Sequence, residues 1–374
     1  MDFLAAVNDN LVSAFTPGSH VCMDESMIKS FHRHLTGKIK IMRKPRPIGN
    51  EIKDISDSRS NVVFRMELYE GREAMQGKEF VDEYGATAAT SLRLTSDIQG
   101  SGRTVIADSW FGSVKTAICL RKRGLHSIML VKTAHRNFPK ELLNETPIRR
   151  GDWVAYSGEI QGVNLQAVAF MDLQKKQFIS TCSTSIPGNP RHTKHHGDVS
   201  RPKVAEEYLS HAASIDIHNH FRTGALGLED VVKTHSPHLR QVTGILGFLF
   251  TNAYLSFRYF KPGQSNLKHG DFKFALSAAM VQYTDVQDRN SSLRSCSSAD
   301  SSIIQSSHKI VRTSYPTPCY MCRHSYAESR KVNTTFRCQR CEVAICKPSN
   351  AAGRICWEKH LDGLPQKRRM NNKK

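Results

Sequence analysis

Short apolar and alternating runs fill residues 20–70, and Gly, Pro, Asn, Asp and Ser separate them. Alternation of apolar and polar positions is typical of strands with one buried face. We therefore predict strands at residues 38–42, 51–55 and 62–69. Because the connections between them are short, these strands are expected to pair in an antiparallel way.

Helical and strand patterns alternate from residue 80 onward. Helical patterns at 80–94 and 114–123 are each followed by a short apolar run, at 104–107 and 127–131. Apolar runs of this length between helices are typical of buried strands. This part of the chain therefore predicts a layered α/β domain.

A second block of β-like patterning follows, with strands predicted at 152–156, 165–172 and 177–182. A His-rich, turn-like stretch comes after it at 188–197. We interpret both together as a β-rich segment, at about residues 150–200, that is inserted into the α/β domain.

Helical patterns dominate after this segment, at 204–216, 242–259 and 272–282. The run at 242–259 is the most apolar part of the chain, yet Thr, Asn, Ser and Arg258 interrupt it. We therefore predict a buried core helix there rather than a membrane span. A Ser-rich stretch at 291–307 has few apolar residues, which is typical of a linker.

Charge narrows the range of partners. The 374 residues include 53 Lys and Arg against 34 Asp and Glu, a formal charge of +19. Such an excess attracts polyanions, so nucleic acid is the first partner to consider, although charge alone also fits a basic soluble protein. Ten cysteines without a secretory signal favour a reducing compartment. The basic run at 367–374 fits a nuclear-import signal as well as a solvated tail.

Cysteine pairs crowd the C-terminal part of the chain. The candidate ligands are Cys319, Cys322, Cys338, Cys341, Cys346, Cys356 and His360. Cys-x-x-Cys pairs present soft thiolates at the spacing that tetrahedral zinc requires, and a core this small needs a metal to fold. Two complete sites need eight ligands, and His324, His308 or a water would supply the eighth. We predict a cross-braced module with one or two structural Zn²⁺ ions.

Three aspartates stand in settings that suit metal-dependent catalysis. Asp24 lies in Met-Asp-Glu-Ser-Met, Asp108 follows the apolar run at 104–107, and Asp216 lies in a helical stretch. Two-metal phosphoryl transfer needs carboxylates that converge on hard Mg²⁺ ions, and strand ends are where α/β folds place such sites. Taken singly, Asp108 also fits a helix N-cap and Asp216 a surface charge.

Several short blocks occur in the order seen in piggyBac-type transposases. They are residues 23–27, 44–53, 107–111, 121–124, 138–142, 201–204 and 215–219. The chain resembles that family over nearly its whole length. The resemblance implies a ribonuclease H-like mixed α/β domain whose DDE/D-type triad is Asp24, Asp108 and Asp216, with two Mg²⁺ ions bound to it. A fourth acidic position of the family falls on Asn219, whose carbonyl oxygen can bind or orient a metal but lacks charge.

The resemblance also implies a function and a domain order. The activity would be cleavage and transfer of DNA strands at transposon ends flanked by TTAA, with transposon-end DNA as partner and a homodimer as an expected assembly. The ribonuclease H-like domain would occupy residues 20–223, and residues 224–290 would be a helical remnant of a dimerisation and DNA-binding domain. A linker at 291–314 would lead to the cysteine-rich zinc domain and basic tail at 315–374.

Two departures from the family keep other readings open. Family members carry several hundred residues before the first aspartate, whereas this chain has 23, which favours an N-terminally truncated copy. Asn219 replaces a carboxylate. An alternative is therefore a catalytically inactive DNA- or chromatin-binding remnant that acts through its zinc module. A RING-like ubiquitin ligase fits less well, because the tail is strongly basic. We expect a nuclear protein without a membrane partner.

Overall fold

The computed structural model divides into two compact units, residues 1–280 and residues 281–374. The residues that the structure describes are 2–42, 44–132, 136–145, 149–182, 184–193, 197–224, 227–264, 266–294, 310–319, 322, 332–339, 344–346 and 356–357. The first unit contains the three candidate catalytic aspartates, and the second contains the described cysteines of the predicted zinc module.

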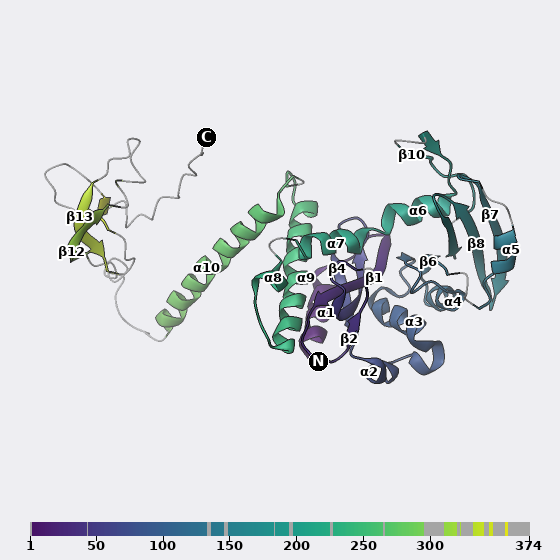
Figure 1. The fold of residues 1–374 in the computed structure, drawn as a ribbon, viewed down its shortest axis with the longest axis horizontal. Helices are drawn as coiled ribbons and strands as arrows, with labels where there is room; N and C mark the ends of the chain where they lie inside the picture. Colours follow the sequence, from purple (N-terminus) through teal and green to yellow (C-terminus); the bar gives the residue numbers. More distant parts are fainter. Residues whose placement is uncertain are drawn as a thin grey trace. The chain divides into compact units, whose positions relative to one another are not determined.

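A nine-stranded mixed sheet forms the centre of the first unit (Figure 1). Its strands are β1 (His20–Lys29), β2 (Lys38–Lys40), β3 (Ile48–Asp57), β4 (Val63–Leu68), β5 (Thr104–Ala107), β6 (His126–Leu130), β7 (Trp153–Ile160), β8 (Val163–Met171) and β9 (Lys175–Ser180). They follow the order β2-β3-β1-β5-β6-β9-β8-β7, and β4 also pairs with β3. The β1–β5 and β5–β6 pairs are parallel, whereas the other pairs are antiparallel.

The antiparallel group predicted near the N-terminus is confirmed. β2 and β4 lie along the same edge of β3, on its first and second halves, and β1 lies along the opposite edge. The turn from β3 to β4 is held by Asp57, whose carboxylate accepts hydrogen bonds from Ser60 N at 2.7 Å and Ser60 Oγ at 2.6 Å. The same carboxylate accepts from Gly18 N at 2.9 Å, so it also fixes the chain that enters β1.

Helices cover both faces of the sheet, as the alternating pattern predicts for a layered domain. On β5, Val105 and Ala107 belong to the core under α3 (Val81–Leu94) and α4 (Val114–Lys122), whereas Ile106 packs with residues of α6 (Lys203–His211) on the other face. Strand side chains alternate between faces, so β5 joins two cores. Each core contains fully buried apolar side chains.

The strands predicted as an inserted β-rich segment continue the main sheet. β9 pairs with β6, and β8 and β7 follow it outward. The stretch predicted as turn-like forms a small hairpin instead, with β10 (Arg191–Thr193) paired to β11 (Gly197–Val199). Thr193 Oγ1 donates to the carbonyl of Gly197 at 3.1 Å, at the end of the paired strands.

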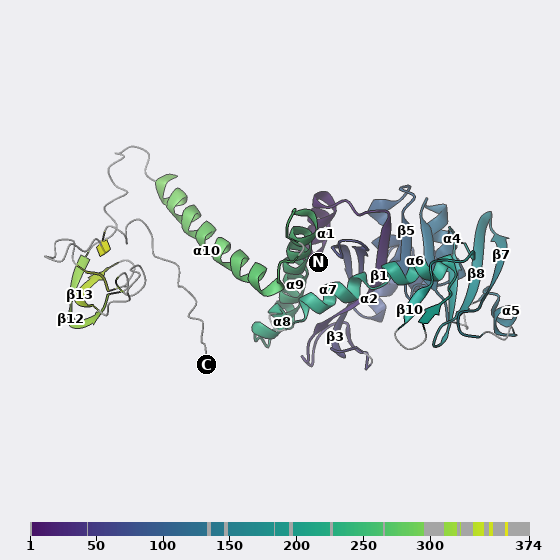
Figure 2. The same cartoon turned by 90° about the horizontal axis from the view of Figure 1, so that it is seen from above.

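Most of the remaining helices of the first unit lie on the β1 side of the sheet, whereas α5 (Lys140–Glu145) lies beside β7 and β8 at the opposite end (Figures 1 and 2). The others are α1 (Asp2–Ala14), α2 (Arg72–Gln76), α7 (Ser214–Arg222), α8 (Leu228–Val231), α9 (Pro237–Phe260) and the start of α10 (His269–Arg294). The single helix predicted at 204–216 forms two helices, α6 and α7, because a turn at residues 212–213 interrupts it.

The apolar run at 242–259 lies within α9, as predicted. Ser236 caps this helix by accepting a hydrogen bond from Leu239 N at 3.3 Å, and Pro237 occupies the first turn, where no backbone N–H is needed. Ile245 and Phe248 of α9 are buried against β1 and β3. In the part of the chain that the structure describes, no helix combines the length and apolar character that a membrane span requires.

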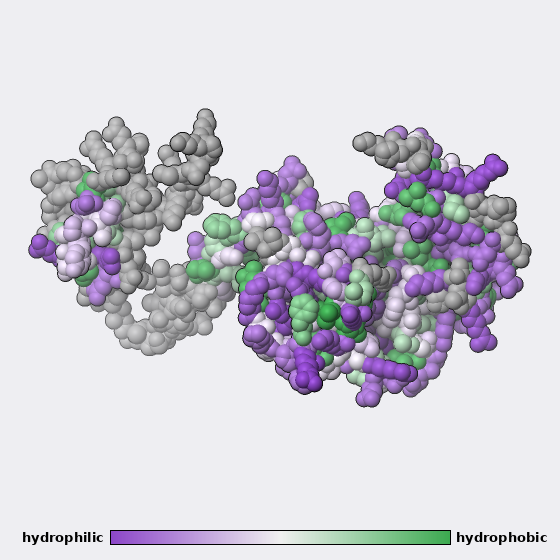
Figure 3. Space-filling model, viewed as in Figure 1, coloured by the Kyte–Doolittle hydropathy of each residue, from purple (hydrophilic) through white to green (hydrophobic). Residues whose placement is uncertain are grey.

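The structure describes only the two ends of the predicted linker at 291–314, since residues 295–309 lie outside the described residues. α10 continues to Arg294, and a strand, β12 (Ile310–Pro318), begins inside the range 291–314. β12 pairs antiparallel with β13 (Asn333–Cys338), and together they form the described sheet of the second unit. Hydrophilic side chains cover much of the face of the first unit seen in Figure 3, with smaller apolar patches between them.

Close packing of α9 on β1 gives a prediction. A Cβ atom added at Gly244 would lie 2.5 Å from Cδ1 of Ile28, whereas one added at Gly247, one turn later, would meet Arg222 Cγ at an ordinary 3.4 Å. We expect Gly244→Ala to lower the free energy of unfolding by about 1–3 kcal/mol, because overpacking forces the helix from the sheet. Gly247→Ala is the matched control. Urea denaturation measures both, and equal stability of the two variants would contradict the packing argument.

Candidate active site

The sheet places Asp24 and Asp108 side by side. Met23 of β1 is in parallel register with Ala107 of β5, so the residues that follow them, Asp24 and Asp108, lie at the same level across the two strands. β5 ends at Ala107, and the chain turns at Asp108, which accepts a hydrogen bond on Oδ1 from Trp110 N at 2.8 Å. This turn directs the chain toward α4. Two of the three predicted carboxylates therefore meet at a strand end.

Glu25 joins them, although the sequence pattern alone did not point to it. One carboxylate oxygen each of Asp24, Glu25 and Asp108 lies within 4.8 Å of the others, and this is the acidic group found among the described residues. Glu25 is buried at 2 % exposure, and Lys53 lies 3.2 Å from its Oε2 while Lys44 lies 3.5 Å from its Oε1. Its position directly after Asp24 was the available signal.

Burial and like charge make Asp24 reluctant to ionise. Burial is the largest cause that raises the pKa of Asp24 to about 7; the negative charge of Asp108 also raises it, whereas Lys44 lowers it. Lys53 also contacts the turn after β5, since its ammonium lies 3.6 Å from the centre of the Trp110 ring. Lys53 on β3 and Lys44 in the loop before β3 thus offset part of the negative charge of the carboxylates.

Asp216 approaches the site from another element. It lies in the first turn of α7, which packs on β1 and β3, and its side chain is exposed. Its oxygen atoms are not part of the 4.8 Å group. The pKa of Tyr208 is raised mainly by burial, and the carboxylates of Asp108, Asp24 and Asp216 are among the groups that also raise it. The structure therefore brings two predicted carboxylates together and leaves the third nearby.

Asn219 lies one turn after Asp216 and makes protein contacts. Its Nδ2 donates to Ser26 Oγ at 2.9 Å, and its Oδ1 accepts from Arg222 Nε at 3.2 Å and Nη2 at 3.0 Å. Beyond Ser26 lies Asp54, a fully buried carboxylate on β3 opposite Asp24. Burial is the main reason that the pKa of Asp54 rises to about 8, and the nearby charge of Asp24 contributes.

The acidic group fits a divalent cation. All three donors are carboxylate oxygens, which hard cations such as Mg²⁺ prefer, and they are held close together from a strand and a strand end. The raised pKa of Asp24, caused mainly by burial and partly by the charge of Asp108, means that ionising this carboxyl is costly, and a cation at the group offsets that cost. Asp24, Glu25 and Asp108 are the residues that would hold it.

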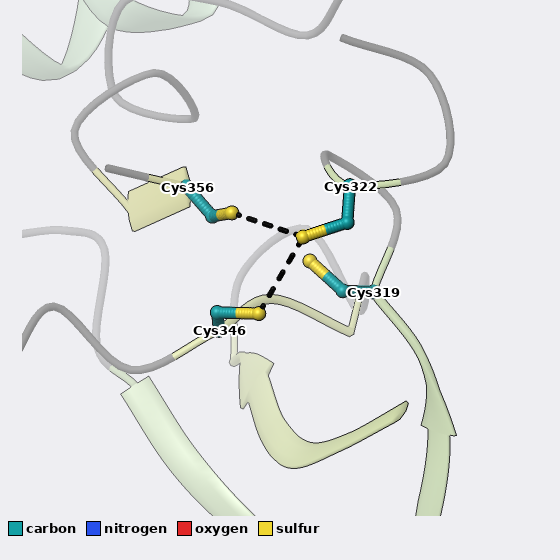
Figure 4. Close-up of side chains that lie close together, drawn as sticks. All are labelled: Cys319, Cys322, Cys346 and Cys356. Carbon is teal, nitrogen blue, oxygen red and sulfur yellow. Dashed lines mark hydrogen bonds between the residues drawn. The ribbon is translucent and has the colours of Figure 1, made fainter. Parts of the chain in front are cut away.

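A second cluster lies in the other unit (Figure 4). The sulfur atoms of Cys319, Cys322, Cys346 and Cys356 all lie within 4.8 Å of one another, and all four side chains are buried. Cys322 Sγ lies 3.7 Å from Cys346 Sγ and 3.4 Å from Cys356 Sγ. A tetrahedron of Zn–S bonds of about 2.3 Å has edges of about 3.8 Å, so the four thiols fit one structural zinc.

The other predicted zinc ligands are not part of this cluster. Cys338 is fully buried in the same small core but does not belong to the group of four sulfurs. Cys341 and His360, as well as the proposed eighth ligands His324 and His308, lie outside the described residues. One Cys-x-x-Cys pair thus lies close to two cysteines that follow the second pair along the chain.

Comparison with known proteins assigns the family. A model of DDE transposases described as Transposase IS4 matches residues 2–254, more than half of the chain. The chain belongs to this transposase family. A solved structure of piggyBac transposase, a synaptic complex with hairpin DNA determined by cryo-EM, has a similar fold, with a TM-score of 0.59 and 18% sequence identity. The similarity covers 91% of this chain and 69% of that one.

These matches confirm the resemblance drawn from the sequence. The family model includes Asp24, Glu25, Asp108, Asp216 and the whole nine-stranded sheet, and the solved structure supports a mixed α/β fold of piggyBac type. A comparison with curated proteins gives no significant match. At 18% identity the structural similarity supports the fold alone, and the chemistry of this chain depends on its own residues.

Proposed function

We propose that this chain is a piggyBac-like transposase whose ribonuclease H-like unit cleaves and transfers DNA strands at TTAA-flanked transposon ends, with Mg²⁺ as cofactor. The observation that carries the proposal is the convergence of Asp24 and Glu25 in β1 with Asp108 at the end of the parallel strand β5, within a chain of a transposase family. Carboxylates from separate elements that meet at one strand end are more typical of a metal site than of structural ion pairs.

Each residue has a role in this proposal. Asp24 and Asp108 bind the cations, Glu25 adds a ligand or orients one, and Asp216 supplies a further carboxylate from α7. When bound, two Mg²⁺ ions supply an activated oxygen nucleophile and stabilise the leaving oxygen of the scissile phosphodiester. Lys44 and Lys53 limit the negative charge that the incoming phosphate has to approach. Because water and then the released 3′ hydroxyl would be the nucleophiles, no covalent bond to the protein is expected.

The second unit is proposed to contact the transposon ends. Zinc held by the four clustered cysteines would fix its small core, and basic side chains of the unit, such as Arg312 and Arg337, suit contacts with the DNA backbone. A homodimer, the domain limits near residues 223 and 315, and a nuclear location belong to the same proposal. They extend the family assignment to assembly and place of action.

A catalytically inactive DNA- or chromatin-binding protein is the second candidate. Two observations favour it: Asp216 lies outside the close carboxylate group, and Asn219 is engaged by Ser26 and Arg222. In this reading the basic surface and the zinc module retain DNA affinity while strand cleavage is lost. Metal-dependent nicking separates the two functions.

The deciding experiment uses the full chain loaded with zinc. A labelled duplex that ends in candidate terminal repeats next to TTAA is incubated with the protein in Mg²⁺, Mn²⁺ or EDTA at low salt, and the same duplex with TTAA scrambled is the control. Cleavage that requires the divalent cation and TTAA supports the transposase proposal. Tight, salt-sensitive binding without cleavage in either cation supports the inactive DNA-binding protein and overturns the first proposal.

A further inference from the structure

A chain of buried hydrogen bonds runs from the sheet into α7. Ser26 Oγ donates to Asp54 Oδ2 at 2.5 Å and accepts from Asn219 Nδ2 at 2.9 Å. Asn219 Oδ1 then accepts from two nitrogens of Arg222. Asp54 and Ser26 are at most 1 % exposed, so water cannot replace these bonds at low cost.

Arg222 anchors the other end of this chain. It is 3 % exposed, forms an ion pair with Glu229, and donates from Nη2 to the carbonyl of Met27 on β1 at 2.8 Å. Glu229 in turn accepts from Lys29 N at 3.1 Å, also on β1. The guanidinium therefore fastens the C-terminal end of α7 to the strand that carries Asp24.

The orientation of the Asn219 amide is determined by these partners. A guanidinium only donates hydrogen bonds, so the oxygen of Asn219 must face Arg222 and its nitrogen must face Ser26. Because its carbonyl oxygen already accepts hydrogen bonds from Arg222, the Asn219 side chain is not free to turn this oxygen toward a cation. Asp216 lies three residues earlier on the same helix, so whatever fixes Asn219 also fixes Asp216 relative to β1.

We propose that Asn219 is a positioning residue that clamps α7 on β1 and so sets where Asp216 lies relative to the Asp24 and Asp108 carboxylates, rather than a fourth metal ligand. Its catalytic part rests on the proposed function; the clamp itself does not. Its neighbours explain why an amide suits this position: the site needs one donor toward Ser26 and one acceptor toward Arg222, and an amide provides both.

A kinetic cycle tests the link to Asp216. We expect Asn219→Leu, which is close in size but cannot hydrogen-bond, to lower kcat of strand cleavage about tenfold or more, with KM for DNA nearly unchanged. In the Asp216→Asn background the same change should have no further effect, because the residue acts through Asp216. Effects that multiply in the double variant would overturn the proposal.

Metal binding and unfolding give readouts that do not need activity. Mn²⁺ binding to the DNA-free protein, followed by electron paramagnetic resonance, should differ less than about threefold between wild type, Asn219→Leu and Asn219→Asp, since a positioning residue is not a ligand. Tenfold tighter binding by Asn219→Asp would instead establish a fourth ligand position. Asn164→Asp, at an exposed position of β8, controls for the added charge.

The clamp can also be tested by thermal unfolding alone. Ser26→Ala and Asn219→Leu should each lower Tm by about 2–6 °C, and the double variant should lower it by no more than the larger single effect plus about 1 °C, because both break one chain. Additive shifts would show that no such chain exists. If wild-type protein cleaves no DNA, the proposed function fails, and this cycle still decides whether Asn219 clamps α7.

Discussion

Asp108→Asn is expected to reduce cleavage of transposon-end DNA by about three orders of magnitude or more, since loss of a metal-binding carboxylate removes several kcal/mol of transition-state stabilisation and each 1.4 kcal/mol is a factor of ten. The substitution keeps the size of the side chain and the acceptor for Trp110 N, so the turn after β5 should persist. Single-turnover cleavage in Mg²⁺ and in Mn²⁺ measures the effect.

The matched control is Asp198→Asn, the same change on the exposed β10–β11 hairpin, which we expect to leave cleavage within about twofold. Thermal unfolding of both variants should stay close to wild type, so that a lost activity reports chemistry and not folding. Undiminished cleavage by Asp108→Asn would remove Asp108 from the centre and with it the proposed metal site. Loss of cleavage with DNA binding retained would establish the carboxylate group as the nuclease centre.

Removal of metal from the second unit is expected to unfold it. The described core of this unit consists mainly of the four clustered cysteines, Cys338, Ile345 and two half-buried neighbours, which bury too little apolar surface to fold by themselves. Apparent binding free energies of structural zinc are on the order of 10–16 kcal/mol, and such metal binding drives folding. A strong chelator should therefore open residues 310–357 to protease, and zinc should restore protection.

Cys322→Ser should reproduce the effect of the chelator, because Cys322 Sγ lies close to both Cys346 and Cys356. Cys182→Ser, at an exposed thiol of the first unit, is the control and should retain all of its zinc. Zinc content by mass spectrometry of the native protein and the rate of limited proteolysis measure both variants. Full zinc content and full protection in Cys322→Ser would refute the four-cysteine site.

Sequence pattern predicted the part of the fold that depends on local chemistry. Alternating strands, the buried strand at 104–107 and the helix at 242–259 are present, since apolar periodicity and turn residues act over a few neighbours. The pattern did not show that the strands at 152–182 extend the main sheet, because the pairing of β9 with β6 depends on contacts between distant residues. The linker at 291–314 stays a prediction, because the structure describes only its ends, where α10 and β12 enter the range.

The candidate site divides in the same way. The sequence by itself determined the family, the presence of Asp24 and Asp108 at strand positions and the soft ligands of the second unit, because motif spacing and residue type carry that information. Only the tertiary structure decided that Glu25 joins the two aspartates, that Asp216 stays outside their group, and that Cys319 and Cys322 share a site with Cys346 and Cys356. It also decided that Asn219 faces Ser26 and Arg222. Strand register and helix packing set these distances, and neither is encoded within a short stretch of chain.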